Sequence, residues 1–190
     1  MDPKTTGLIH HPYQPPAGFG AVPVAVHKAS TVTFPDTATV GGQSVTLNGM
    51  GVRVAYIFVK VYVGGLYLAT PTHDAPAAVQ TDEPKRVLLQ FLRDVTHEEM
   101  VKAMREGFAH TASASLQPQV DQFSGFFTQP LVTGSQASFD YVPGTGTTVV
   151  IGGQTKGTIP GPDFMRALWG IWLGDKPADA SLKAGMLGTD

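Results

Sequence analysis

The sequence contains no cysteine. This absence excludes disulfides, thiolate nucleophiles and cysteine-based zinc or iron–sulfur sites. Charge is also scarce: charged residues make up 15% of the 190 residues, against about 25% in an average protein. The 13 Lys and Arg and 15 Asp and Glu give a formal net charge of −2. This balance excludes a polybasic nucleic-acid-binding protein, whose affinity comes from neutralising phosphates.

Long hydrophobic runs are missing too. No stretch of 18 apolar residues occurs, so we expect no membrane span. The first residues, Met1-Asp2-Pro3-Lys4, lack the hydrophobic region of a signal peptide. Catalytic signatures are equally absent, because there is no GxSxG, no HExxH and no Walker lysine. The glycines of Gly49-Met50-Gly51 are predicted to be turn glycines, and we expect no metal and no cofactor.

The 22 glycines and 15 prolines favour turns and strands over long helices. Four of the prolines fall within residues 1–22, which we predict to be an extended N-terminal arm. Residues 23–190 are then predicted to form one domain. A domain of this length buries roughly 70% of the surface that its unfolded chain exposes, so it can be stable without disulfides or other cross-links.

The first part of this domain carries β signals. Residues 38–40 and 44–47 flank Gly41-Gly42, which is typical of a hairpin. Asn48-Gly49 predicts a further turn. Residues 52–68 are so rich in Val, Tyr, Ile and Phe that we predict one long strand, bent at Gly64-Gly65. Further strands are predicted at residues 31–34, 86–92, 137–141, 147–151 and 155–159.

Helical signals are fewer and lie later in the sequence. Thr96 and Glu99 form a capping box, which predicts that a helix begins there. Pro162 suits the first turn of the last long helix, which Gly174 closes. Shorter helices are predicted at residues 75–81, 118–128 and 179–187. This order of elements predicts an α+β fold, with a large antiparallel sheet and helices gathered on one side.

Arg53 is the most informative polar residue. It is the only formal charge between Asp36 and Lys60, and it opens the most apolar stretch of the chain. An arginine on a sheet face is either paired with a carboxylate or presented to an anionic ligand, which its planar fork can grip. Within one continuous strand, alternation would place the side chains of Lys60 and Tyr62 on the other face of the sheet from Arg53, unless a bulge shifts the register.

Several motifs resemble the chalcone isomerase superfamily, particularly its bacterial chalcone-isomerase-like branch. The resemblance implies an open-faced β-sandwich with a ligand cleft between the sheet and the helices. It covers about Val32 to Gly188. The segments that carry it are Leu47–Arg53, Lys60–Leu68, Phe164, Ile171–Pro177, Leu182-Lys183 and Leu187-Gly188.

The superfamily includes plant isomerases that close chalcones and fatty-acid-binding proteins without isomerase activity. Arg53 matches the arginine that both groups place in the cleft. Tyr62 matches the fatty-acid-binding group, whereas the isomerases have a threonine there. Met100 stands nearest to an isomerase tyrosine, and Ala103 and Gly107 replace a lysine and an asparagine. The polar set that activates a chalcone is therefore largely missing.

We predict a non-catalytic protein that binds a fatty acid or other apolar carboxylate, with Arg53, Tyr62 and Met100 at the ligand. The alternative is an isomerase or lyase of the chalcone isomerase type, acting on a phenolic or enone substrate. A third hypothesis makes Arg53 one half of a buried ion pair in a scaffold protein. The resemblance to the bacterial branch favours a periplasmic location, with the cytoplasm as the alternative.

Overall fold

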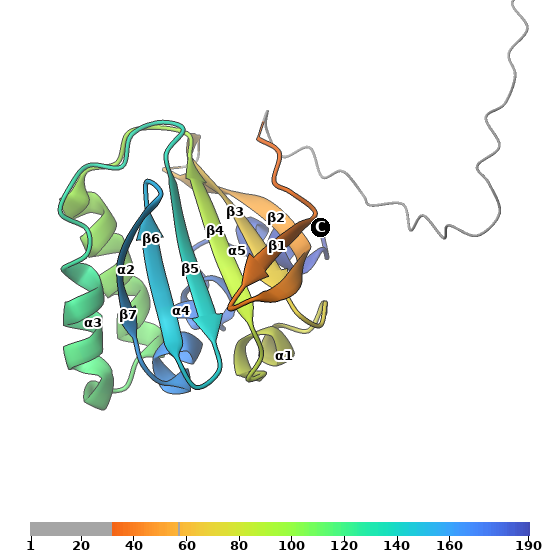
Figure 1. The fold of residues 1–190 in the computed structure, drawn as a ribbon. Coiled ribbons are helices and arrows are strands. Elements are labelled where there is room, and N and C mark those ends of the chain that lie inside the picture. The colour runs from red at the N-terminus through yellow and green to blue at the C-terminus, as the bar shows by residue number, and fades with distance from the viewer. Residues whose placement is uncertain (1–31, 57) are drawn as a thin grey trace, which may run out of the picture.

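The computed structural model describes residues 32–56 and 58–190. Its centre is a seven-stranded sheet in which every strand pairs antiparallel with its neighbours in sequence, in the order β1 to β7. Figure 1 shows this curled sheet with the helices on one side. The α+β prediction is confirmed, while the predicted arm at residues 1–22 lies outside the described residues. The strands are β1 (Thr37–Val40), β2 (Gln43–Ala55), β3 (Val59–Leu68), β4 (Lys85–Phe91), β5 (Gln136–Val142), β6 (Gly146–Ile151) and β7 (Gln154–Ile159).

The helices cover the sheet unevenly. The C-terminal helix α5 (Ala180–Leu187) lies on β2 and β3, α4 (Pro162–Leu173) lies on β6, and α2 (His97–Thr111) packs against α4. The predicted capping box at Thr96 and Glu99 is present. Shorter helices are α1 (Ala75–Gln80), the 3-10 turn η1 (Ala114–Leu116) and α3 (Gln117–Ser124). The described residues contain no helix that is long and apolar enough to cross a membrane.

The prediction of one strand over residues 52–68 was wrong. The chain turns at Tyr56 and Phe58, so that β2 and β3 form an antiparallel hairpin. The predicted turn at Asn48-Gly49 was also wrong, because Asn48 sits at a bulge inside β2. Its side-chain amide donates to the carbonyls of Thr72 and Met186, both at 3.0 Å. The predicted strand at residues 31–34 is irregular over its described part.

Gly64 and Gly65 do not mark a bend in the strand, as was predicted; glycine is required there because neighbouring side chains pack closely against the backbone. Both glycines lie inside the continuous strand β3. A Cβ on Gly64 would lie 3.1 Å from Leu182 of α5, and one on Gly65 would lie 2.6 Å from Phe34 on the other face. The β2 glycines Gly49 and Gly51 likewise face the backbone of α5 and are not turn glycines.

The two faces of the sheet have different partners. The helix-covered face carries the main core, in which Trp169, Trp172 and Phe139 have no exposed surface. The opposite face has a small apolar cluster around Phe34 and Tyr67 and then becomes polar.

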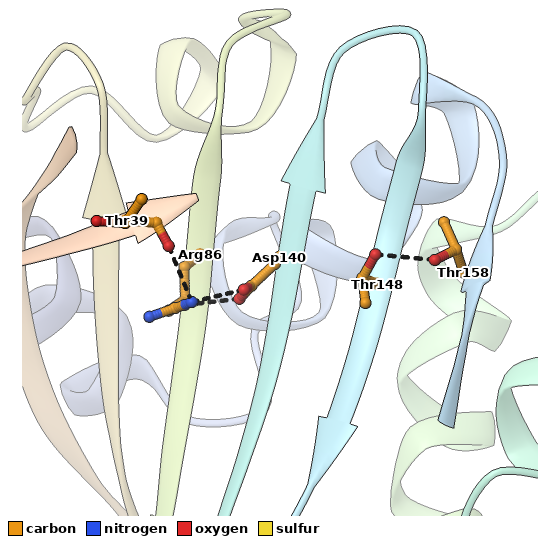
Figure 2. Close-up of polar contacts among 5 residues, drawn as sticks. All are labelled: Thr39, Arg86, Asp140, Thr148 and Thr158. Carbon is orange, nitrogen blue, oxygen red and sulfur yellow. Dashed lines mark hydrogen bonds and ion pairs between the residues drawn. The ribbon is translucent and has the colours of Figure 1, made fainter. Parts of the chain in front are cut away.

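Figure 2 shows the polar part of that outer face. Arg86 on β4 grips Asp140 on β5 through two hydrogen bonds, at 2.6 and 2.5 Å. Its guanidinium also donates to the Thr39 carbonyl. Beyond them, the hydroxyls of Thr148 and Thr158 lie 2.9 Å apart. On the outer face, therefore, the arginine of β4 is paired with a carboxylate from the neighbouring strand β5.

Lys85 is an unusual buried charge at the start of β4. Only 1% of it is exposed, and its ammonium group donates to the carbonyls of Ala78 and Thr81 at 2.8 and 2.6 Å. Desolvation lowers the pKa of Lys85 from 10.5 to about 8, although Glu83 and Asp82 partly oppose it. As the pH rises, Lys85 therefore loses its proton at a lower pH in the folded protein than in the unfolded chain.

Stability should consequently depend on alkaline pH. We expect the free energy of unfolding to rise between pH 8 and 10, because the unfolded state binds more protons there, by roughly 2 kcal/mol. Burial raises the pKa values of Tyr67 and Tyr141 to about 12, so stability should fall again above pH 10 as the unfolded tyrosines ionise first. Urea titrations at stepped pH values measure this, and Lys85→Met should remove the rise. A flat profile in the unmodified protein would contradict the prediction.

Candidate functional site

Arg53 and Tyr62 lie side by side at one end of the sheet. They are directly opposite each other in the β2–β3 register, so both side chains project from the same face. The guanidinium carbon of Arg53 lies 5.8 Å from the centre of the Tyr62 ring. A register shift follows immediately between Arg53 and Val54. Lys60, by contrast, pairs with Val54 and is exposed.

Arg53 has no carboxylate partner among the described residues. None of the ion pairs found within residues 32–56 and 58–190 involves it. Its Nε is buried and makes no hydrogen bond within the described part of the chain. Arg86, on the other face of the sheet, is by contrast paired with the carboxylate of Asp140. The hypothesis of a structural ion pair at Arg53 is therefore wrong for the described residues.

Tyr62 is held by the helical layer. Its hydroxyl oxygen accepts a hydrogen bond of 3.0 Å from the indole N–H of Trp172 on α4. Burial raises the pKa of the Tyr62 hydroxyl above its usual 10.0, although the nearby Arg53 charge and the Trp172 bond oppose the shift. The phenol is neutral at physiological pH, so its own O–H is free to donate to a further acceptor.

Asp179 fixes the strand next to Arg53. One carboxylate oxygen caps α5 by accepting from the N–H groups of Ser181 and Leu182, at 2.8 and 3.0 Å. The other oxygen accepts from the Val54 N–H at 3.0 Å, at the register shift. Desolvation opposes ionisation of Asp179, but hydrogen bonds from Leu182 and Val54 outweigh it and lower the pKa of its carboxyl. Asp179 therefore joins the bulge beside Arg53 to the helical layer.

Met100 lies in the first turns of α2 and is 3% exposed. It belongs to the same buried cluster as Tyr62, together with Phe91, which meets the Tyr62 ring edge-on at 5.8 Å. Sequence reasoning placed Arg53, Tyr62 and Met100 at one site, and the structure puts Tyr62 in contact with Arg53 and in one core with Met100. It missed Trp172 and Asp179, whose helical positions were predicted but whose bonds to the site were not.

A separate groove of about 640 Å³ lies along α4. Its walls come from α1, the C-terminal end of α2, α4 and the α4–α5 connection, and they include neither Arg53 nor Tyr62. Around Tyr62 itself, the layer between sheet and helices is filled by aromatic side chains such as Trp172 and Phe91. No group of three or more metal-binding side chains occurs in the regions that the structure describes.

A family model described as chalcone isomerase-like matches residues 26–188. The chain belongs to the chalcone isomerase-like family. Among curated protein sequences, none matches this chain.

Solved structures share the fold of this chalcone isomerase-like protein. One is the crystal structure of the Arabidopsis thaliana fatty-acid binding protein AtFAP1, with a TM-score of 0.65 and 16% sequence identity. The alignment covers 81% of this chain and 90% of that one. At this identity the likeness establishes the architecture, and the open-faced arrangement of sheet and helices predicted from the sequence is confirmed.

Proposed function

We propose that this protein binds a fatty acid or a similar apolar carboxylate without transforming it, with Arg53 and Tyr62 at the carboxylate. The observation that carries the proposal is the Arg53 guanidinium, which has no carboxylate partner among the described residues and whose buried Nε makes no hydrogen bond, beside a neutral phenol whose proton has no acceptor in that part of the chain. Two donors that converge in this way suit a carboxylate. The fatty-acid-binding function of the structural relative AtFAP1 supports the same ligand class.

The apolar surroundings suit the rest of such a ligand. Met100, Phe91 and the aliphatic side chains of β3 make up the buried cluster around Tyr62. Because these side chains fill the layer in the ligand-free structure, an acyl chain would enter by displacing them. Methionine is the side chain best able to yield, since it is unbranched and flexible.

The direct experiment is organic extraction of the purified protein followed by mass spectrometry. We expect a fatty acid in stoichiometric amount, and binding of a C16 fatty acid by the stripped protein. Protein that carries no lipid and does not bind a C16 fatty acid would overturn the proposal.

Chalcone cyclisation by this protein should be negligible. Isomerase activity requires donors fixed where the oxyanion develops. In the first turns of α2, the position nearest to the isomerase tyrosine is Met100, which offers no donor. An absorbance assay with a simple chalcone should show the buffer rate. A rate well above it, lost in Arg53→Ala, would favour the alternative of an isomerase.

Tyr62→Phe tests the phenol, and the structure changes the expected result. From the sequence, loss of the hydroxyl should leave the ligand-free protein equally stable. Trp172 however loses its hydrogen-bond acceptor in a fully buried setting, so the free energy of unfolding should fall by about 1–3 kcal/mol. Affinity for a C16 fatty acid should also fall, by about tenfold. Urea unfolding and ligand titration measure the two effects separately.

Tyr67→Phe is the matched control. Tyr67 lies on the same strand but on the other face, where its hydroxyl donates to the Pro35 carbonyl at 2.9 Å. This variant should lose stability and keep its ligand affinity. If both variants lowered affinity equally, Tyr62 would have no special role in binding.

A further inference from the structure

The tip of the β2–β3 hairpin exposes apolar side chains. Tyr56 and Phe58 are 89% and 86% exposed, and Val59 next to them is 38% exposed. Only one other large hydrophobic side chain in the described regions is exposed, Val132. Solvent-facing hydrophobic residues normally occur singly, whereas a cluster of them marks a surface that meets an apolar partner.

The backbone at this tip is also unusual. Tyr56 has a φ of 48°, and no other non-glycine residue in the described chain has a positive φ. This conformation costs a non-glycine residue roughly 1–2 kcal/mol. Because the Tyr56 side chain lies in solvent, no packing contact in the folded monomer offsets this cost.

The hairpin carries charge of one sign. Between Asp36 and Asp74 the sequence contains Arg53 and Lys60 but no aspartate or glutamate. Lys60 is exposed one residue after Val59. An exposed aromatic tip flanked by lysine has the composition of segments that insert at a bilayer surface, where aromatic rings reach the headgroup level and cations meet anionic lipids.

We propose that Tyr56, Phe58 and Val59, together with Lys60, form a docking tip that inserts into the interfacial region of an anionic lipid bilayer. A bilayer fits better than a protein partner, because protein hot spots lie at the centre of a patch whose rim excludes water. Side chains almost 90% exposed at a hairpin tip have no such rim. Docking would bring the end of the sheet that holds Arg53 to the membrane, where apolar carboxylates reside.

Insertion can be observed directly with Phe58→Trp. The native Trp169 and Trp172 have no exposed surface, so their emission should not respond to lipid. On vesicles of equal parts phosphatidylcholine and phosphatidylglycerol, we expect the new tryptophan to shift to the blue and to be quenched by brominated lipid. Lys102→Trp, at a site 77% exposed on α2, is the matched control and should do neither. The ligand-free protein is used, so the result does not depend on the proposed fatty-acid site.

Two further variants test the chemistry of the tip. The double variant Tyr56→Ser with Phe58→Ser should bind these vesicles at least about tenfold more weakly, because two apolar rings no longer leave water. Lys60→Glu should weaken binding about fivefold or more at low salt, and less at high salt. Lys102→Glu is its charge-matched control and should bind as the unmodified protein does.

Other outcomes would overturn the proposal. They are an emission spectrum of the Phe58→Trp variant that does not shift on the vesicles, or equal vesicle binding by the double serine variant and the unmodified protein. A self-association in sedimentation that the serine substitutions abolish, without vesicle binding, would assign the tip to contacts between copies of this chain instead.

Discussion

Replacing Arg53 with alanine is expected to weaken binding of a C16 fatty acid about 10- to 150-fold, because a charge-assisted hydrogen bond contributes roughly 1.5–3 kcal/mol. The melting temperature of the ligand-free protein should change little. No described carboxylate depends on Arg53, so its removal orphans no partner. Titration with a fluorescent fatty acid and a thermal melt provide the two measurements.

Arg86→Ala is the contrasting variant. Arg86 is held by Asp140 on the outer face of the sheet, away from the proposed ligand. It should reduce stability and leave affinity unchanged, the reverse of the pattern expected for Arg53→Ala. A large fall in the melting temperature of Arg53→Ala, with unchanged affinity, would remove Arg53 from the proposed site.

Gly49→Ala should be strongly destabilising. A Cβ at this position would overlap the carbonyl oxygen of Gly185 and lie 2.8 Å from that of Met186. Both atoms belong to the backbone of α5, which cannot move without leaving β2. We expect a loss of about 3 kcal/mol and a fall in melting temperature of roughly 6–12 °C.

Gly125→Ala is the control for this effect. Gly125 has a φ of −67°, and the nearest atom to an added Cβ is the Gln122 carbonyl oxygen at 3.4 Å. Its melting temperature should match that of the unmodified protein. If Gly49→Ala melted at the same temperature too, the contact between α5 and β2 would be looser than the structure indicates.

Local chemistry made much of the fold predictable. Gly41-Gly42 turns the first hairpin with φ values of 57° and 79°, as a pair that tolerates positive φ should. Thr96 and Glu99 cap α2 through reciprocal bonds between neighbours in sequence. These signals depend on residues a few positions apart, and the sequence displays them directly.

The break between β2 and β3 had no such signal. It falls at Tyr56 and Phe58, residue types that favour strands, and no glycine or proline marks it. The error also hid how Arg53 meets Tyr62. In one continuous strand, the side chains of Arg53 and Tyr62 would lie on opposite faces of the sheet. Across the hairpin the two residues are paired instead, so their side chains lie on the same face.

The supporting contacts of the site were beyond local inference for a different reason. Trp172 reaches Tyr62 across 110 residues of sequence, and Asp179 reaches Val54 across 125. A helical stripe predicts that Trp172 is buried but not what its N–H meets. A capping residue is recognisable from its own neighbours, yet nothing local shows that its second oxygen holds a distant strand.

That long reach of Asp179 has a consequence for synthesis on the ribosome. Because each strand pairs with the one made just before it, the sheet can grow in step with translation. The strand that bears Arg53 is different. It is among the first to be made, yet the helix that anchors it at Val54 and Asn48 follows more than a hundred residues later. A nascent chain therefore carries a sheet whose Arg53 end still lacks its helical anchor, and this end is completed only when residues 179–187 emerge.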